Sequence, residues 1–314
     1  MSNRAERRRA QREASKRPLP LLEPTTFWKD YLGILRRGLK QNGFFNYEDF
    51  EEHTFDIRYF DAMMRLVEAR PRCTHEASTF KLPPSSSKHQ KGVDSLKEKI
   101  RQGTLLTPHL SKDVLDLGKR DGMLLDWRVH HLHLGEKIDL KTKRIERTGP
   151  VLFARFEPDD AYLIGIEEHG AWADPDVLET IIGHWPHLVT EAIGMAGPPP
   201  GQDPNITEKE RKQARAGGVM TFYTAKNGKV YMGGGGYSTA GTATQATDRA
   251  DSMRENLRYH EARVAREFPA WCQEMKAMGR SLPPRIRLVL DVDENRRLCV
   301  VAPVAKLRWP FPER

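Results

Sequence analysis

Three short runs with the character of β-strands constrain the fold of this chain more than any other feature. They cover 126–135, 151–156 and 162–166. Their length and their content of β-branched and aromatic residues are typical of strands, and the Pro-Asp-Asp sequence at 158–160 predicts a tight hairpin turn. Since the charged segment 139–149 separates the first two runs, the pattern predicts an antiparallel meander of at least three strands.

The patterns on either side of the meander predict an α+β fold class built from several modules. A helical N-terminal region is expected at 25–71, and a central antiparallel-meander module with flanking helices at 93–193. A C-terminal module at 207–314 is expected to hold two hairpins around a long helix, because an Asn-Gly turn and a later pair of β-rich runs flank a long helical pattern. Segment 72–92, with a Pro-Pro-Ser-Ser-Ser run and no periodic pattern, and the Pro- and Gly-rich segment 194–206 are predicted linkers.

The first 20 residues form a basic leader that carries much of the positive charge. The formal net charge of the chain is +8, and these 20 residues contain seven Arg and Lys side chains against two Glu. Such a segment binds phosphate backbones by releasing counterions, whatever the nucleotide sequence. The alternative is a flexible, solvated leader that aids solubility. The residues predicted to contact nucleic acid lie in this leader and in a later basic helical segment: Arg7, Arg8, Arg9, Arg12, Lys209, Arg211 and Lys212.

Composition predicts a cytoplasmic protein without a membrane segment. No apolar run approaches the roughly 20 residues that span a bilayer, and the basic leader lacks the apolar core of a secretory signal. Cys73, Cys272 and Cys299 are odd in number and far apart, so they fit neither a disulfide framework nor a CxxC metal site. We therefore expect free thiols in a reducing compartment, and we expect no cofactor.

Histidines are concentrated in and after the first predicted strand. Six of the eleven lie within 126–187, and histidine can transfer protons or bind a metal near neutral pH. Strand alternation places His131 and His133 on one face and His130 on the other. One interpretation is a metal site in which His169 joins His131 and His133. Another is that these side chains only pack within the sheet.

The same residues also fit cleavage of RNA without a metal. Attack by a 2′-oxygen needs a general base, a general acid and cationic stabilisation of the phosphorane. His131, His133 and His169 are the candidates for the proton transfers. Arg155 on the neighbouring strand is the predicted phosphate clamp, because a guanidinium bonds phosphate bidentately and Arg128 is expected on the opposite face of the first strand.

A glycine run at 233–236 leads through Ser and Thr residues into the predicted long helix. Backbone N–H groups at such a helix start can hold a phosphate, which makes Gly235, Gly236 and Thr242 candidate phosphate-binding residues. The run lacks the lysine and the spacing of a P-loop. The alternative is a flexible loop in which Thr242 or Thr244 caps the helix.

The central module has the order helix pair, three antiparallel strands, closing helix. Its meander comprises Trp127-Arg128-Val129-His130 and the segments 151–156 and 162–166, and its closing helix falls in 170–185. In this order the module, over 93–193, resembles the RelE/ParE-type toxin fold. The resemblance implies one of two activities. Members that are ribonucleases cut messenger RNA, often on the ribosome, with basic and histidine side chains, whereas others act on gyrase.

Together these features predict a nucleic-acid-directed protein of toxin or phage-defence type. Metal-independent ribonuclease activity is the leading hypothesis, and RNA is a better candidate partner than DNA. Two alternatives stay open. One is a non-catalytic nucleic-acid-binding or assembly protein, with a protein partner or self-association. The other is a metal-dependent hydrolase centred on His131, His133 and His169.

Overall fold

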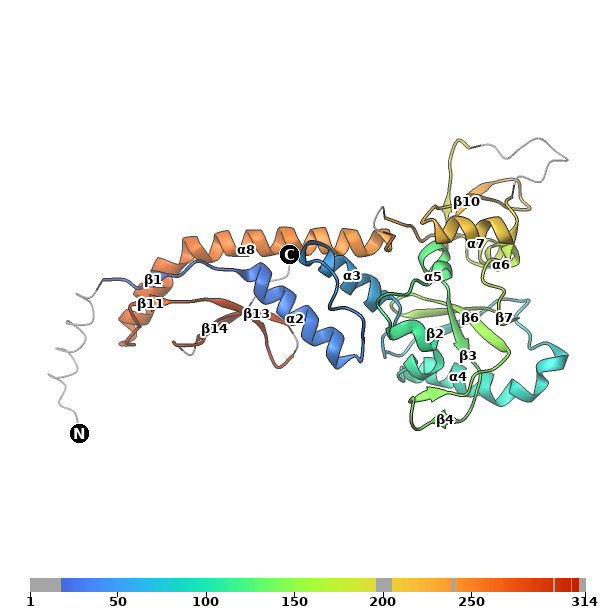
Figure 1. The fold of residues 1–314 in the computed structure, drawn as a ribbon, viewed down its shortest axis with the longest axis horizontal. Coiled ribbons are helices and arrows are strands. Elements are labelled where there is room, and N and C mark those ends of the chain that lie inside the picture. The colour runs from blue at the N-terminus through green and yellow to red at the C-terminus, as the bar shows by residue number, and fades with distance from the viewer. Residues whose placement is uncertain (1–17, 196–204, 239–240, 296, 306, 311–314) are drawn as a thin grey trace. The chain divides into compact units, whose positions relative to one another are not determined.

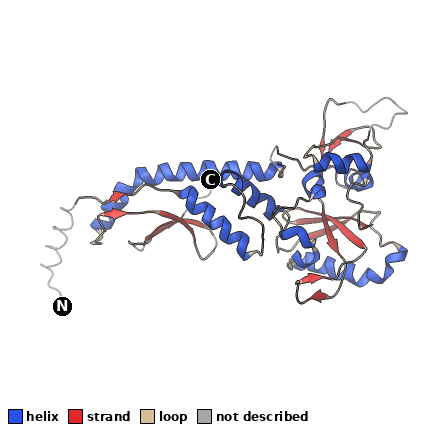
Figure 2. Cartoon of the chain, viewed as in Figure 1, coloured by secondary structure: helices blue, strands red, loops and turns tan. Residues whose placement is uncertain are grey.

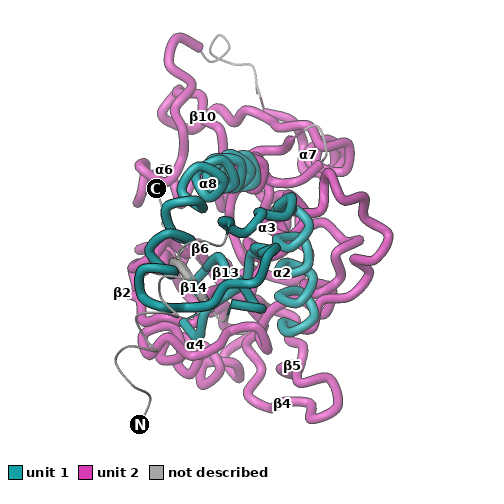
Figure 3. Tube along the Cα trace, turned by 90° about the vertical axis from the view of Figure 1, so that its left-hand side faces the viewer, with its two compact units in different colours: residues 1–42, 249–314 teal, residues 43–248 magenta. Residues whose placement is uncertain are grey.

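The chain forms two compact units, one made of 1–42 with 249–314 and the other of 43–248 (Figure 3). The predicted α+β class is confirmed by the helices and small sheets that make up both units. The computed structural model describes these residues: 18–195, 205–238, 241–295, 297–305 and 307–310. The predicted phosphate contacts of Arg7, Arg8, Arg9 and Arg12 lie outside them.

The unit 43–248 is centred on a four-stranded sheet with helices on both of its sides (Figures 1 and 2). Its α-helices are α3 (Glu52–Met64), α4 (Gln90–Gln102), α5 (Gly122–Trp127), α6 (Pro175–His184) and α7 (Glu208–Ala216). Short 3-10 helices occur at η1 (Pro84–His89), η2 (Thr107–His109), η3 (Lys112–Leu115) and η4 (Pro186–Leu188). The central strands are β2 (Cys73–Glu76), β3 (His130–His133), β6 (Pro150–Phe156) and β7 (Asp160–Glu168). Smaller sheets are formed by β4 (Ile138–Asp139), β5 (Arg144–Ile145), β8 (Thr190–Glu191), β9 (Tyr223–Thr224) and β10 (Val230–Met232).

The predicted meander is confirmed, and the sheet has one strand more than the sequence indicates. Its order is β2-β7-β6-β3, with β3 and β7 antiparallel to β6 and β2 parallel to β7. Strand β2 lies in the segment 72–92, which the sequence predicts as a linker. It is a short edge strand, largely exposed and without apolar alternation, so no local pattern indicates it.

Both faces of the sheet are buried, which explains why β6 and β7 are almost continuously apolar. Val151 and Phe153 belong to one core cluster together with Ile181 of α6. Leu152 belongs to the opposite cluster, together with Leu96 of α4. The sheet is therefore a middle layer between these two helices.

Two helix starts are capped by the side chain that precedes them. Asp174 precedes α6, and its carboxylate accepts a hydrogen bond from the Asp176 N–H at 2.9 Å. Ser111 precedes η3, and its hydroxyl accepts from the Asp113 N–H at 3.3 Å. These side chains satisfy backbone donors that have no partner inside the helix.

The first strand is shorter than the sequence predicts. Helix α5 includes Asp126 and Trp127, and Arg128 ends it in the left-handed conformation with a φ of 58°. Strand β3 starts only two residues later, so the prediction of a strand from 126 is wrong at its beginning. Alternation holds within β3, where His131 and His133 pair with the α6-facing residues of β6.

The second unit joins segments that are far apart in the sequence. Its elements are β1 (Leu21–Leu22), α2 (Phe27–Gln41), β11 (Arg285–Ile286), β12 (Val289–Val292), β13 (Leu298–Ala302), β14 (Leu307–Pro310) and most of α8 (Thr244–Ala277). The apolar stripe of α2 is buried, as its helical spacing predicts. The Phe27 N–H donates to a Glu261 carboxylate oxygen at 2.7 Å, which ties α2 to α8.

This division differs from the predicted domain boundaries. Helices α2 and α3, expected in one N-terminal region, belong to different units, and the module expected at 207–314 divides after residue 248. The pairing of β1 with β11 and the contact of α2 with α8 link distant segments, so they leave no local signal in the sequence. No helix in the described ranges is long and apolar enough to cross a membrane.

Candidate functional site

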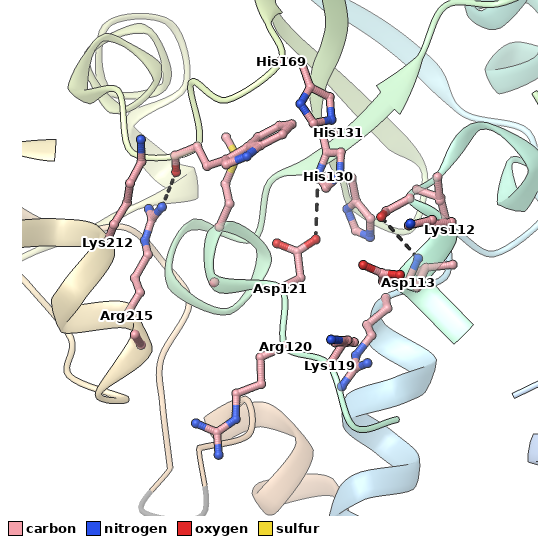
Figure 4. Close-up of a pocket in the computed structure, with 18 of the residues that line it drawn as sticks. Lys112, Asp113, Lys119, Arg120, Asp121, His130, His131, His169, Lys212 and Arg215 are labelled. Atoms are coloured by element: carbon pink, nitrogen blue, oxygen red, sulfur yellow. Dashed lines mark hydrogen bonds and ion pairs between the residues drawn. The ribbon is translucent and has the colours of Figure 1, made fainter. Parts of the chain in front are cut away.

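A pocket of about 490 Å³ lies within the unit 43–248 and opens beside the histidine-bearing strand (Figure 4). Its lining comes from β3, from the segment 110–123 that leads into α5, from the loops around Arg147 and Trp172, and from α7. His131 and His169, two of the predicted catalytic residues, are part of this lining. The structure therefore brings them together.

The pocket is strongly basic. Its five exposed basic side chains are Lys112, Lys119, Arg120, Arg147 and Lys212, and its two acidic side chains are Asp113 and Asp121. Two further arginines of the lining are buried and paired. Arg65 contacts Asp61 at 2.8 Å and Arg215 contacts Asp126 at 3.0 Å. The excess of exposed positive charge suits the pocket to an anionic ligand.

His131 lies next to a carboxylate that helix α5 holds in place. Asp121 caps α5, with one oxygen accepting from the Leu124 N–H at 3.0 Å, and its other oxygen lies 3.7 Å from Nδ1 of His131. Burial lowers the pKa of His131, while the negative charge of Asp121 opposes that shift. At 3.7 Å the contact is an ion-pair distance and not a hydrogen bond, so Asp121 acts on the imidazole through its charge.

His169 is exposed and lies between an arginine and a tryptophan. Nε2 of His169 is 3.0 Å from a guanidinium nitrogen of Arg147, which donates to it. The centre of the His169 ring is 4.8 Å from that of Trp172, and the His131 ring is 4.5 Å from the same indole. Two imidazoles thus flank the Trp172 ring, and Arg147 contacts one of them.

His133 lies behind the pocket. It is 2% exposed, its Nδ1 accepts from the Thr148 N–H at 3.4 Å, and its ring is 5.8 Å from that of His169. Burial, with the nearby charge of Arg147, lowers the pKa of His133 to about 4. The prediction that His133 transfers protons beside His131 is therefore not supported, because the side chain supports the strand from inside.

A buried histidine that the sequence did not indicate holds the same strand. Nδ1 of His109 donates to the His133 carbonyl at 2.8 Å, and its Nε2 accepts from Lys99 at 2.9 Å. Burial lowers the pKa of His109 to about 4. This imidazole is neutral and links α4 to the end of β3.

Arg155 is not a phosphate clamp in this structure, which corrects the prediction. Its guanidinium is buried, donates to the Leu188 carbonyl and lies 3.1 Å from the Glu157 carboxylate. Arg155 is on the same sheet face as His131 but near the other end of β6, where η4 covers it. Arg147, from a segment predicted only as a charged loop, is the arginine that reaches the pocket.

Helix α7 also places its basic residues differently from the prediction. Arg211 is 1% exposed and lies over the rings of Trp127 and Tyr223, so it cannot contact phosphate in this conformation. Its Nη1 donates to the Thr221 hydroxyl at 2.7 Å. Lys209 and Lys212 are exposed; these two remain candidate phosphate contacts.

The glycine run packs against the end of α5, and its backbone N–H groups do not form the predicted phosphate-binding site. The N–H groups of Gly235 and Gly236 donate to the carbonyls of Asp126 and Leu125 at 3.1 and 2.8 Å. A Cβ on Gly235 would lie 2.1 Å from the Leu125 oxygen, so only glycine allows this approach to the end of α5. Thr242 is fully buried, and its hydroxyl bonds to a nearby serine.

The three histidines of the metal alternative are not arranged as a ligand set. In the described ranges no group of three or more His, Cys, Asp or Glu side chains could hold a metal ion. His133 uses Nδ1 for a backbone N–H, and His169 has the cationic Arg147 at Nε2. Both contacts compete with metal ligation by those nitrogens.

Three residues of the site were not found by sequence reasoning. The position of Asp121 could have been predicted from the sequence, because this residue precedes an apolar run in the way that a helix N-cap does. Arg147 and Trp172 have no local signal, since their positions depend on how two loops fold back over β3.

Comparisons of the chain with protein-family models, with curated proteins and with solved structures find no match. The basis for assigning a function is therefore the pocket itself, with His131 beside Asp121, His169 beside Arg147, and five exposed cations.

Proposed function

We propose that this chain is a nucleic-acid-directed protein of toxin or phage-defence type that cleaves RNA without a metal. The observation that carries the proposal is the pairing of His131 with Asp121, 3.7 Å apart, in the wall of a pocket that also holds His169 and Arg147. Cleavage of RNA by its own 2′-hydroxyl needs these parts: a base, an acid and a cation.

His131 is the general base of the proposed reaction. Its Nε2 takes the proton of the 2′-hydroxyl while the 2′-oxygen forms a bond to phosphorus. The lowered pKa of His131, caused mainly by burial, keeps the imidazole neutral near pH 7. Asp121 stabilises the imidazolium that results, because its carboxylate lies at Nδ1.

His169 and Arg147 act on the other side of the phosphorus. Arg147 binds the phosphate and stabilises the negative charge of the phosphorane. With Arg147 on the phosphate, Nε2 of His169 is free to carry the proton that the 5′-oxygen takes as the bond from phosphorus to that oxygen breaks. The products are a 2′,3′-cyclic phosphate and a 5′-hydroxyl.

The toxin-type part of the proposal comes from the resemblance in the order of elements. The helices before β3, the antiparallel strands β3, β6 and β7, and the following helix α6 occur in the order on which the resemblance to RelE/ParE-type toxins rests. That order supports a fold class only. The activity rests on the pocket.

The test is cleavage of end-labelled RNA by the full chain in the presence of EDTA. We expect cyclic-phosphate products and no cleavage of DNA of the same sequence, which lacks the 2′-hydroxyl. His131→Ala and His169→Ala are each expected to slow cleavage about 100-fold or more. His187→Ala is the matched control, because His187 is exposed and lies outside the pocket, with its Nε2 3.3 Å from the Tyr162 hydroxyl. RNA that stays intact, including ribosome-bound messenger, contradicts the proposal.

The second candidate is non-catalytic binding of nucleic acid, favoured by the five exposed cations of the pocket. These suffice for phosphate binding even if the histidines are structural. The two candidates differ in one readout: this one predicts salt-dependent binding without cleavage. Deletion of 1–17 is then expected to weaken binding uniformly across sequences.

A further inference from the structure

The pocket offers two kinds of surface, and phosphate binding explains only one of them. Its exposed cations attract anions, but Leu110, Val114, Met123 and Trp172 also line it. Inorganic phosphate gains nothing from an apolar wall, since its oxygens need polar partners. A nucleotide has a flat base with an apolar face and an anionic phosphate, and it matches both surfaces.

Trp172 is the part of the apolar wall best suited to a base, and its position is fixed. Its half-buried ring packs on Phe153, with ring centres 5.8 Å apart. Its backbone carbonyl accepts a hydrogen bond from Arg215, which is itself held by Asp126 at 3.0 Å. An indole that is already ordered loses little conformational entropy when a base stacks on it.

The aromatic wall and the reacting groups are neighbours. The Trp172 ring lies 4.5 Å from the His131 ring and 4.8 Å from the His169 ring, between ring centres. Arg147 contacts His169 at 3.0 Å. A base against Trp172 therefore leaves the attached sugar and phosphate close to both imidazoles and to the guanidinium.

We infer that the pocket takes one unpaired nucleotide, with its base against Trp172 and its phosphate toward Arg147, so that the substrate is single-stranded RNA. This inference rests on the proposed function. A volume of about 490 Å³ falls within the range of small-ligand pockets, roughly 300–1,000 Å³. Such a pocket accepts a single splayed nucleotide, whereas the bases of a duplex are paired and stacked and cannot enter.

The test compares one RNA sequence in three forms: as a single strand, annealed to its complement, and placed in the loop of a hairpin. All are measured for binding and cleavage at one salt concentration. We expect the single strand and the loop to be bound and cut about 10-fold better than the duplex, because unpairing costs the duplex free energy.

Variants of Trp172 test the role of the aromatic wall. Trp172→Ala is expected to weaken single-strand binding about 10-fold, the size of one lost base–aromatic stack, whereas Trp172→Phe retains most of the affinity. Trp185→Ala is the matched control. Trp185 is also half-buried, but it packs on Tyr162, with ring centres 5.1 Å apart, and lies outside the pocket.

The outcomes separate this inference from the proposed function. Equal binding and cleavage of single strand and duplex overturns the inference and leaves the ribonuclease standing. So does a Trp172→Ala protein that unfolds like wild type and binds the single strand with wild-type affinity. If no form of RNA is bound, the proposed function fails and the inference fails with it.

Discussion

The sheet face that packs on α6 carries polar side chains near both of its ends, and only one end is open to a ligand. At the closed end Arg155 is 4% exposed, with its guanidinium bonded to the Leu188 carbonyl and the Glu157 carboxylate. At the open end His131 forms part of the pocket wall. The difference is the covering segment, since η4 closes over Arg155 and nothing comparable in the described chain fills the pocket beside His131.

Helix α7 repeats this contrast along nine residues. Arg211 and Arg215 point inward and lie over the Trp127 ring, at 5.5 and 4.2 Å from its centre. Lys209 and Lys212 point outward and are exposed. Basic residues that look equivalent in the composition therefore divide into those that hold the fold and those that can meet a ligand.

The largest expected loss of stability comes from replacing one of the inward-pointing arginines of α7. Arg215→Met removes the partner of the buried Asp126, whose pKa is already raised by burial. An uncompensated buried charge typically costs about 3–5 kcal/mol, so the free energy of unfolding, measured in urea at pH 7, is expected to fall by that amount. Lys209→Met, on the exposed side of the same helix, is expected to change it by less than about 0.5 kcal/mol.

A double variant checks the cause of that loss. Asp126→Leu in the Arg215→Met background removes the unpaired carboxylate and is expected to recover part of the stability, because a hydrophobic replacement of a buried ion pair is often neutral. An Arg215→Met protein as stable as wild type would show that the buried pair does not hold α7 to α5.

Acid acts on the buried histidines, and the loss expected from any one of them is smaller than that from Arg215→Met. Burial lowers the pKa of His109 to about 4 from 6.5. The unfolded chain therefore binds more protons below pH 6.5, so the stability from this group is complete above pH 6.5 and is lost as the pH falls toward 4. The loss is up to about 3 kcal/mol for a shift of this size, and His130 and His133, with pKa values also lowered to about 4 by burial, act in the same direction.

His109→Asn isolates that contribution. The amide can still donate to the His133 carbonyl but does not titrate, so the variant is expected to lose less stability than wild type between pH 7 and pH 4.5. The measurement is the urea midpoint as a function of pH. His187→Asn, at an exposed position, is expected to keep the wild-type profile; a His109→Asn protein with that same profile contradicts the assignment.

Local patterns account for what the sequence could predict of the fold. The hairpin at 158–160 was predicted from a few neighbouring residues and is confirmed. The helix starts after Ser111 and Asp174 and the apolar stripe of α2 are local features of the same kind. What could not be predicted depends on distant partners. Strand β2 exists because it pairs with β7, and Arg128 adopts a positive φ because α5 ends there against the glycine run.

The candidate site shows the same limit. Strand alternation put His131 on the correct face, and the density of histidines pointed to the right region of the chain. Alternation could not show that Thr148 covers His133 or that η4 covers Arg155, because each cover comes from another segment. Arg147 lines the pocket where Arg155 was predicted to do so, because a loop brings Arg147 to the open end of the sheet.

The smallest effect on stability, and the sharpest test of the open end, is expected from Arg147. The side chain is exposed and contacts His169 at its tip, at 3.0 Å, so Arg147→Ala is expected to change the free energy of unfolding by less than about 0.5 kcal/mol. If Arg147 contacts one phosphate, its removal lowers the slope of log affinity for single-stranded RNA against log salt by about 0.7. Lys141→Ala, an exposed cation of the same loop outside the pocket, should leave the slope unchanged. If both variants lower the slope equally, RNA binds to the positive charge of the whole loop. The open end of the sheet is then no more a binding site than the closed end.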